Sequence, residues 1–497
     1  MQRASGILMP IFSLPSKYGI GDFGKEAYNF VDFLSLSKQK FWQILPLVQT
    51  GYGNSPYSSV ASQSFNPYFI SIEKLCEQGL LRKSEIELSL NRGDRIDYSF
   101  LYGVRFPLLK KAFSRFNQND TKFKSFIKKG SFLDYALFMS LKYVFGGEDF
   151  YNWPDKFKYR EVKALKQFKK DYKEEILFWQ FVQFIAQNQW LELKAYANSK
   201  GVRIIGDLPL YVALDSVDVW TNPTLYKINE DFSPKKVAGV PPDYFCEDGQ
   251  LWGNPVYDYQ VHKKDNFSWW TDRIDKVLTV YDYVRIDHFR GLDRYYEVEP
   301  TAKNARIGEW VEVPEELFEA IHSKVDKSKI IAEDLGVIDD GVRNLLAKVG
   351  YPGMKILSFA FNGDSANTYL PEKLEEKSIC YTGTHDNDTL LGLISSASEW
   401  DKNNLFNGVK SSLEKMQIDY EVTDDKSLVN AIIILGFKCK SNLFIMPMQD
   451  VVLCDQTFRI NQPGEVSNLN WSIRFDKKCF NSKVIKALSK LTQKYNR

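Results

Sequence analysis

The sequence predicts a (β/α)₈ barrel enlarged by two large insertions, and three observations lead to that fold class. The chain has 497 residues, a length that suits one barrel with inserted segments. Eight short apolar runs end in polar or glycine-rich segments, and helical patterns lie between several of them. Because these runs are apolar almost throughout, they are typical of parallel strands that are covered on both faces.

The expected strands are spread over most of the chain. The eight runs are Gly6–Phe12, Phe41–Leu47, Val202–Pro209, Asp282–His288, Lys329–Gly336, Met354–Ala360, Ser378–His385 and Asn442–Met448. Apolar residues at helical spacing predict helices at Lys25–Ser37, Glu174–Lys200 and Lys483–Tyr495.

Two of the spacings between these runs are much longer than one helix needs. We therefore expect a single catalytic barrel over residues 1–497, with a mainly helical subdomain inserted at approximately 52–200. A second insertion, at approximately 210–280, is expected to form an active-site loop subdomain. The lysine-rich stretch 156–173 is expected to be a solvated helix face.

The composition favours an uncharged partner. Lys plus Arg number 65 and Asp plus Glu 63, so the net charge is only +2. This balance argues against nucleic acid or an anionic membrane as the main partner. Aromatic residues make up 15% of the chain, enough to line a groove as well as a core.

The cysteines and the N-terminus indicate a soluble protein of a reducing compartment. No two of the six cysteines stand at metal-ligand spacing, so a structural zinc site is not expected. The first apolar run is short and interrupted by Pro10, which does not match the layout of a signal peptide. No window approaches the roughly 20 apolar residues of a transmembrane helix. We expect a cytoplasmic location.

Charged residues cluster where several expected strands end, namely at Asp207, Asp287, Glu333–Asp334 and His385–Asp386. In a parallel barrel these ends converge on one mouth. Arg285 and Asp287 are two apart on a strand, so they share a face. Such an arginine keeps the carboxylate ionised, as a nucleophile must be, although an ordinary ion pair at a strand end has the same spacing.

Several carboxylates at one mouth fit two kinds of chemistry. In glycoside chemistry one carboxylate attacks the anomeric carbon and a second donates a proton. The other use is to bind a divalent metal. The aromatic excess and the lack of a histidine-rich ligand set favour glycoside chemistry. Segments 51–57 and 239–255 combine aromatics with Gly and Pro, which suits stacking on sugar rings, or loops held by their own aromatics.

A series of motifs connects the chain to a known family. They are Ser55–Tyr57, Gly206–Val212, Asp215–Trp220, the Pro-Pro-Asp-Tyr-Phe segment, Val284–Gly291, Ala332–Gly336, Gly383–Asn387 and Asn461–Gly464. In this order they resemble the 4-α-glucanotransferases, also called amylomaltases or disproportionating enzymes, of glycoside hydrolase family 77 in the α-amylase clan. The resemblance covers nearly the whole chain. It implies transfer of a 1,4-α-glucan segment to the 4-hydroxyl of an acceptor sugar, with retention.

The resemblance also implies roles for individual residues. It makes Asp287 the nucleophile, Glu333 the general acid/base and Asp386 a third carboxylate that holds sugar hydroxyls. Retention requires the first two carboxyl groups to lie about 5–5.5 Å apart. The expected substrate-binding residues are Tyr57, Asp207, Tyr244, Phe245, Trp252, Asn254, Arg285 and His385. The reaction requires no cofactor and no metal.

Three other functions stay open on the sequence alone. An α-glucan hydrolase uses the same carboxylates with water as the acceptor. A non-catalytic glucan-binding protein could keep the fold without turnover. A metal-dependent barrel lyase or isomerase also places carboxylates at the mouth, and a chelator distinguishes it.

Overall fold

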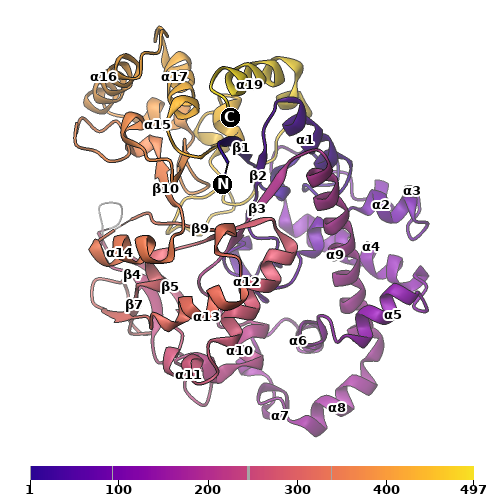
Figure 1. Ribbon diagram of the computed structural model, residues 1–497. Coiled ribbons are helices and arrows are strands. Elements are labelled where there is room, and N and C mark those ends of the chain that lie inside the picture. The colour runs from indigo at the N-terminus through magenta and orange to yellow at the C-terminus, as the bar shows by residue number, and fades with distance from the viewer. Residues whose placement is uncertain (1, 92, 243–246, 337) are drawn as a thin grey trace.

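Eight parallel strands form the barrel at the centre of the molecule (Figure 1), in the order β10-β11-β12-β1-β2-β3-β6-β9. The computed structural model describes residues 2–91, 93–242, 247–336 and 338–497. The N–H of Ala332 donates to the carbonyl of Pro352 at 3.0 Å, which joins β9 to the segment before β10. The barrel strands are β1 Ala4–Leu8, β2 Phe41–Gln43, β3 Arg203–Leu208, β6 Tyr283–Ile286, β9 Ile330–Ala332, β10 Gly353–Ile356, β11 Ser378–Tyr381 and β12 Leu443–Pro447.

Each predicted run overlaps one of these strands, although most of the strands end earlier than predicted, and the predicted fold class is confirmed. The reason lies in burial on both faces: every residue of β1 and of β12 is buried. A single glycine on β3 allows one close approach. A Cβ on Gly206 would lie 2.0 Å from the ring of Tyr281, so only glycine lets that tyrosine pack against β3.

Helices fill the chain between β2 and β3 and lie along one side of the barrel (Figure 1). They are α2 Ile72–Glu77, α3 Lys83–Glu87, α4 Tyr98–Arg115, α5 Thr121–Lys128, α6 Leu133–Val144, α7 Asp155–Lys158, α8 Val162–Asp171 and α9 Lys173–Ser199. We propose that they form the expected helical subdomain. The lysines of α8 are exposed, as a solvated face requires.

Two buried glutamines on α9 connect this helical unit to the segment that follows β2. Gln183 accepts from the N–H of Phe65 at 2.8 Å and donates to its carbonyl at 2.9 Å. Gln189 makes the same pair of hydrogen bonds with Ser71. A side-chain amide thus replaces a strand partner for buried backbone, which would otherwise lack hydrogen bonds.

A second, antiparallel sheet was not predicted. Its order is β5-β4-β7-β8, and its strands are β4 Val237–Val240, β5 Gln250–Pro255, β7 Arg294–Val298 and β8 Glu309–Glu312. The 239–255 segment was expected to be a loop, but both of its ends are strands. Besides β5, β4 pairs with β7, which is more than 50 residues away, and local propensity does not reveal such a long-range pairing.

The remaining helices surround the barrel (Figure 1). They are α1 Lys25–Leu36, α10 Val217–Thr221, α11 Tyr259–Lys264, α12 Ser268–Val280, α13 Glu316–Lys324, α14 Asp340–Val349, α15 Leu390–Ser396, α16 Glu399–Lys415, α17 Asp425–Lys438, α18 Met448–Val451 and α19 Ser482–Lys494. The predicted helices at 25–37, 174–200 and 483–495 correspond to α1, α9 and α19. Within the described ranges, no helix is long and apolar enough to cross a membrane.

Candidate active site

Arg285 is the centre of a buried charge network at the mouth of the barrel. The register of β3 and β6 places Asp207 beside Arg285. Arg285 donates to both oxygens of Asp207, from Nε at 2.9 Å and from Nη2 at 2.6 Å. The same Nη2 donates to Oδ1 of Asp287 at 2.8 Å, so these two residues share a face as their spacing predicts. One guanidinium therefore serves two carboxylates.

Glu333 occupies the position on the neighbouring strand β9 that corresponds to Asp287 on β6. Because Ile286 pairs with Ala332, Asp287 and Glu333 are the next residues on adjacent parallel strands, whose backbones are roughly 5 Å apart. The backbone N–H groups of His288 and Leu335 donate to the two oxygens of Glu333, at 2.6 Å and 3.0 Å. His288 adopts the left-handed conformation, with φ 51° and ψ 51°, and its N–H points at Glu333.

The environments of these two carboxyl groups set their proton affinities. Burial and the carboxylates of Asp207 and Asp386 raise the pKa of Asp287 to about 7, although the contact with Arg285 opposes the shift. Burial, followed by the charge of Asp287, raises the pKa of Glu333 well above its ordinary value. Within the described part of the chain, no basic side chain hydrogen-bonds Glu333. The proton of this pair therefore stays on Glu333.

Tyr57 connects this network to the His385 side of the site. Its hydroxyl donates to Oδ2 of Asp207 at 2.5 Å, and its pKa is raised by burial and by that carboxylate. Its ring lies parallel to the imidazole of His385, with ring centroids 5.0 Å apart. The indole of Trp471 contacts both rings, with centroids 5.8 Å from each. An aromatic wall thus runs beside Asp287.

His385 and Asp386 form a turn after β11. The side chain of Asp386 is 42% exposed, far more than the 4% of His385. Nε2 of His385 lies 3.2 Å from Oδ2 of Asp386. Burial lowers the pKa of His385, so its imidazole is neutral at pH 7. Asp386 is therefore the acid most accessible to a substrate on the His385 side of the site.

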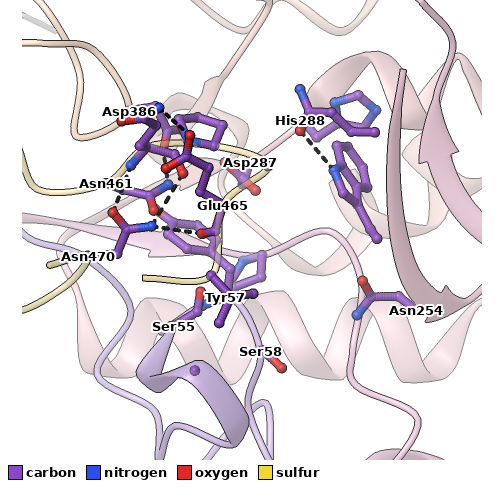
Figure 2. A pocket seen from close by; sticks show the side chains of 18 of the residues that line it. Ser55, Tyr57, Ser58, Asn254, Asp287, His288, Asp386, Asn461, Glu465 and Asn470 are labelled. Carbon is purple, nitrogen blue, oxygen red and sulfur yellow. Dashed lines mark hydrogen bonds between the residues drawn. The ribbon is translucent and has the colours of Figure 1, made fainter. Parts of the chain in front are cut away.

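A cavity of about 610 Å³ opens over these groups. Figure 2 shows Asp287 between Asp386 and Asn461 on one side and His288 on the other. The indole of Trp252 meets the His288 ring edge-on, with centroids 4.8 Å apart. Asn254 lines the cavity, and its Nδ2 donates to the carbonyl of Val212 at 2.8 Å. Polar and aromatic side chains thus both line the space.

The structure brings most of the sequence-predicted site residues together. Those that line the cavity are Tyr57, Trp252, Asn254, Asp287, His385 and Asp386. Asp207 and Arg285 are buried and bonded to residues of that lining, and partly buried Glu333 is bonded to the backbone N–H of His288. Trp252 and Asn254 lie on strand β5 rather than on a loop. Tyr244 and Phe245 lie outside the described residues.

Among the acids predicted at the strand ends, Asp334 is the one whose side chain does not point into the barrel mouth. Its carboxylate accepts from the N–H of Met354 at 2.5 Å and is buried between β9 and β10. Residues next to each other on a strand face opposite sides, so this separation from Glu333 follows from the strand geometry. Asp334 is therefore a structural acid.

Among the cavity-lining residues that sequence reasoning missed, three bear on the reacting groups: His288, Asn461 and Trp471. His288 is part of a motif that drew attention only to Arg285 and Asp287. Asn461 stands in an Asn-Gln-Pro-Gly turn, a signal for a turn but not for what it contacts. In the described part of the chain, no group of three or more His, Cys, Asp or Glu side chains could hold a metal ion.

The fold and the position of the site define a barrel enzyme whose reaction takes place at the carboxyl ends of the strands. The family model described as 4-alpha-glucanotransferase matches residues 9–479. The chain therefore belongs to the 4-alpha-glucanotransferase family of glycoside hydrolase family 77.

Relatives match over nearly their full length. A 4-alpha-glucanotransferase of Clostridium butyricum is 42% identical, over 98% of this chain and 100% of the relative. One from Streptococcus pneumoniae is 40% identical, over 100% of this chain and 98% of the relative. The amylomaltase of Streptococcus agalactiae, solved with acarbose, has a TM-score of 0.94 at 37% identity, and all of both chains is covered.

Proposed function

We propose that this chain is a 4-α-glucanotransferase that works by a retaining double displacement. It transfers a segment of a 1,4-α-D-glucan to the 4-hydroxyl of an acceptor glucose or glucan. One observation carries the mechanism. Asp287, which contacts a guanidinium, lies one strand away from Glu333, which is bonded by backbone N–H groups. Such a pair supplies one ionised and one protonated carboxyl group.

In the first step, a carboxylate oxygen of Asp287 attacks the anomeric carbon of the donor. The bond from that carbon to the glycosidic oxygen breaks, and the proton of Glu333 moves to the leaving oxygen. The fragment with the reducing end departs, and the rest of the glucan is covalently bound to Asp287. Retention requires the two carboxyl groups to lie about 5–5.5 Å apart, and the adjacent strand positions of Asp287 and Glu333 support such a separation.

In the second step, Glu333 acts as the base. It takes the proton of the acceptor's 4-hydroxyl while that oxygen attacks the anomeric carbon. The bond to Asp287 breaks, and both carboxyl groups return to their starting states. Two inversions give net retention.

The other side chains of the site bind the donor and acceptor sugars. Asp386 and His385 face the cavity and are placed to bind hydroxyls of the donor sugar. Arg285 donates to Asp287 and to Asp207, and Tyr57 donates to Asp207. This chain of hydrogen bonds keeps Asp287 in position. The acarbose complex of the Streptococcus agalactiae relative supports an α-glucan site here.

Trp252 and Asn254 line the His288 side of the cavity, and we assign this side to the leaving group in the first step and to the acceptor in the second. Trp252 contacts His288, whose backbone holds Glu333. The described part of the 239–255 segment lines the cavity through Trp252 and Asn254, and we expect the segment to exclude water from the intermediate and favour a sugar as the acceptor. Sugar binding by Tyr244 and Phe245 stays a prediction. A cytoplasmic location stays a prediction.

Incubation with maltotriose, without added metal, tests the function. Transfer yields glucose together with maltopentaose and longer chains, which separation by length detects. Glucose and maltose with nothing longer than the substrate would establish a hydrolase instead. Unchanged maltotriose together with measurable binding would establish a glucan-binding protein. Loss of activity with a chelator would indicate a metal-dependent enzyme.

A further inference from the structure

We infer that Asn461 is a positioning residue for Asp386: its amide holds one carboxylate oxygen so that the acid keeps one orientation toward the donor sugar. The inference rests on the proposed function, in which Asp386 acts on that sugar. Asn461 follows β12 and lies 75 positions after Asp386 in the chain. Figure 2 shows the two side chains next to each other at one side of the cavity.

The contact between these two side chains is short and reinforced by the backbone. Nδ2 of Asn461 donates to Oδ1 of Asp386 at 2.6 Å. The backbone N–H of Asn461 donates to the carbonyl of His385 at 3.1 Å. Nη2 of Arg459 donates to the carbonyl of Asp386 at 2.7 Å, and its Nε donates to the carbonyl of Asn461 at 2.8 Å. The two turns are therefore bonded at side-chain and main-chain level.

Asp386 needs such a partner more than the other two acids do. Asp287 is bonded to Arg285, and Glu333 is bonded by two backbone N–H groups. The side chain of Asp386 is 42% exposed, and no described Lys or Arg lies within ion-pair distance of it. Without Asn461, the Asp386 carboxylate would turn between staggered rotamers. With Oδ1 bonded to the amide, Oδ2 lies 3.2 Å from Nε2 of His385.

The backbone on both sides of Asn461 is hydrogen-bonded to residues other than Asp386. The N–H of Gln462 donates to Oδ1 of Asn470 at 3.1 Å, and the N–H of Trp471 donates to the carbonyl of Ile460 at 2.8 Å. Trp471 in turn contacts the rings of Tyr57 and His385. These contacts support the backbone from which the Asn461 amide reaches Asp386, as a preorganised site requires.

Asn461 also lines the cavity, so a test has to separate positioning of Asp386 from direct binding of sugar. A double-mutant cycle does this. Asn461→Ala is made in the wild-type chain and in an Asp386→Ala chain, which has no side-chain oxygen to accept from the amide. A hydrogen bond to a charged group corresponds to a loss of about 10–100-fold, which we expect in kcat with little change in KM. In the Asp386→Ala background the same change is expected to cost less than about threefold.

Gln462→Ala provides a matched control, since this neighbouring amide donates to Glu465 and not to Asp386. Its effect should be equal in both backgrounds. Rates are measured on maltosyl fluoride, because fluoride is a better leaving group than a sugar and so raises the rate of the slow Asp386→Ala chains. Thermal unfolding midpoints show whether each variant is folded.

If Asn461→Ala lowers kcat equally in both backgrounds, or raises only KM, the inference is overturned and Asn461 is a direct sugar ligand. A wild-type chain that forms no longer glucans from maltotriose would instead refute the proposed function. The two failures are therefore distinguishable.

Discussion

Asp287 and Glu333 stand at matching positions on neighbouring strands, yet their surroundings differ in one decisive way. A guanidinium contacts Asp287 at 2.8 Å, whereas Glu333 is bonded by backbone N–H groups at 2.6 Å and 3.0 Å. Burial raises the pKa of both carboxyl groups, but only one has a directly bonded cation to oppose that shift. A fold can therefore obtain a nucleophile and an acid from similar side chains by placing a single arginine.

The largest effect is expected from removing the nucleophile. Asp287→Asn should lower turnover of maltotriose by about 10³-fold or more, because no covalent intermediate forms. Binding of maltotriose, measured by titration calorimetry, should persist. Asp272→Asn, at an exposed acid that pairs with Lys324, is the control and should keep full activity. Near wild-type turnover by Asp287→Asn would mean that another group attacks.

Glu333→Gln should lower maltotriose turnover by about 10²–10⁴-fold, because no proton reaches the leaving oxygen. The first step with maltosyl fluoride should be largely retained, since fluoride leaves without an acid. Asp287→Asn should not be rescued by that donor. If both variants respond alike to maltosyl fluoride, the division of roles between the two carboxyl groups is wrong.

Changes around Asp287 should move the acidic limb of the pH–rate profile in opposite directions. The step needs ionised Asp287, so activity is present above its pKa and is lost as pH falls through it. Arg285→Lys breaks the bidentate contact with Asp207 and weakens the single bond to Asp287, so it raises the pKa of Asp287 and should move the limb up by about one pH unit. Asp207→Asn removes a neighbouring negative charge and should move it down. Initial rates from pH 4 to 9 measure both, and limbs that move together would contradict the network.

The smallest effect is expected on the acceptor side. Trp252→Ala removes an aromatic contact with His288 and should raise the acceptor KM about 3–10-fold. The first step with maltosyl fluoride should change little. Trp252→Phe keeps a ring at that position and is the matched control. An equal loss in both steps would place Trp252 with Asp287 rather than with Glu333.

The sequence alone determined the barrel and most of the site. The eight strands could be recognised because burial on both faces requires continuous apolar runs, and a polar residue at the end of a run marks the mouth. Asp207, Asp287, Glu333 and Asp386 were found in this way. The motifs then named the family, and the comparisons confirm it.

Only the tertiary structure decided the contacts between distant segments. Three contacts show this: the pairing of β4 with β7, the bond from His288 to Glu333 and the bond from Asn461 to Asp386. Each joins residues 45 to 75 positions apart in the chain. Such contacts depend on how strands and turns are placed in space, and a local pattern holds no information about that placement. Whether Glu333 or Asp334 faced the mouth likewise depended on the register of β9.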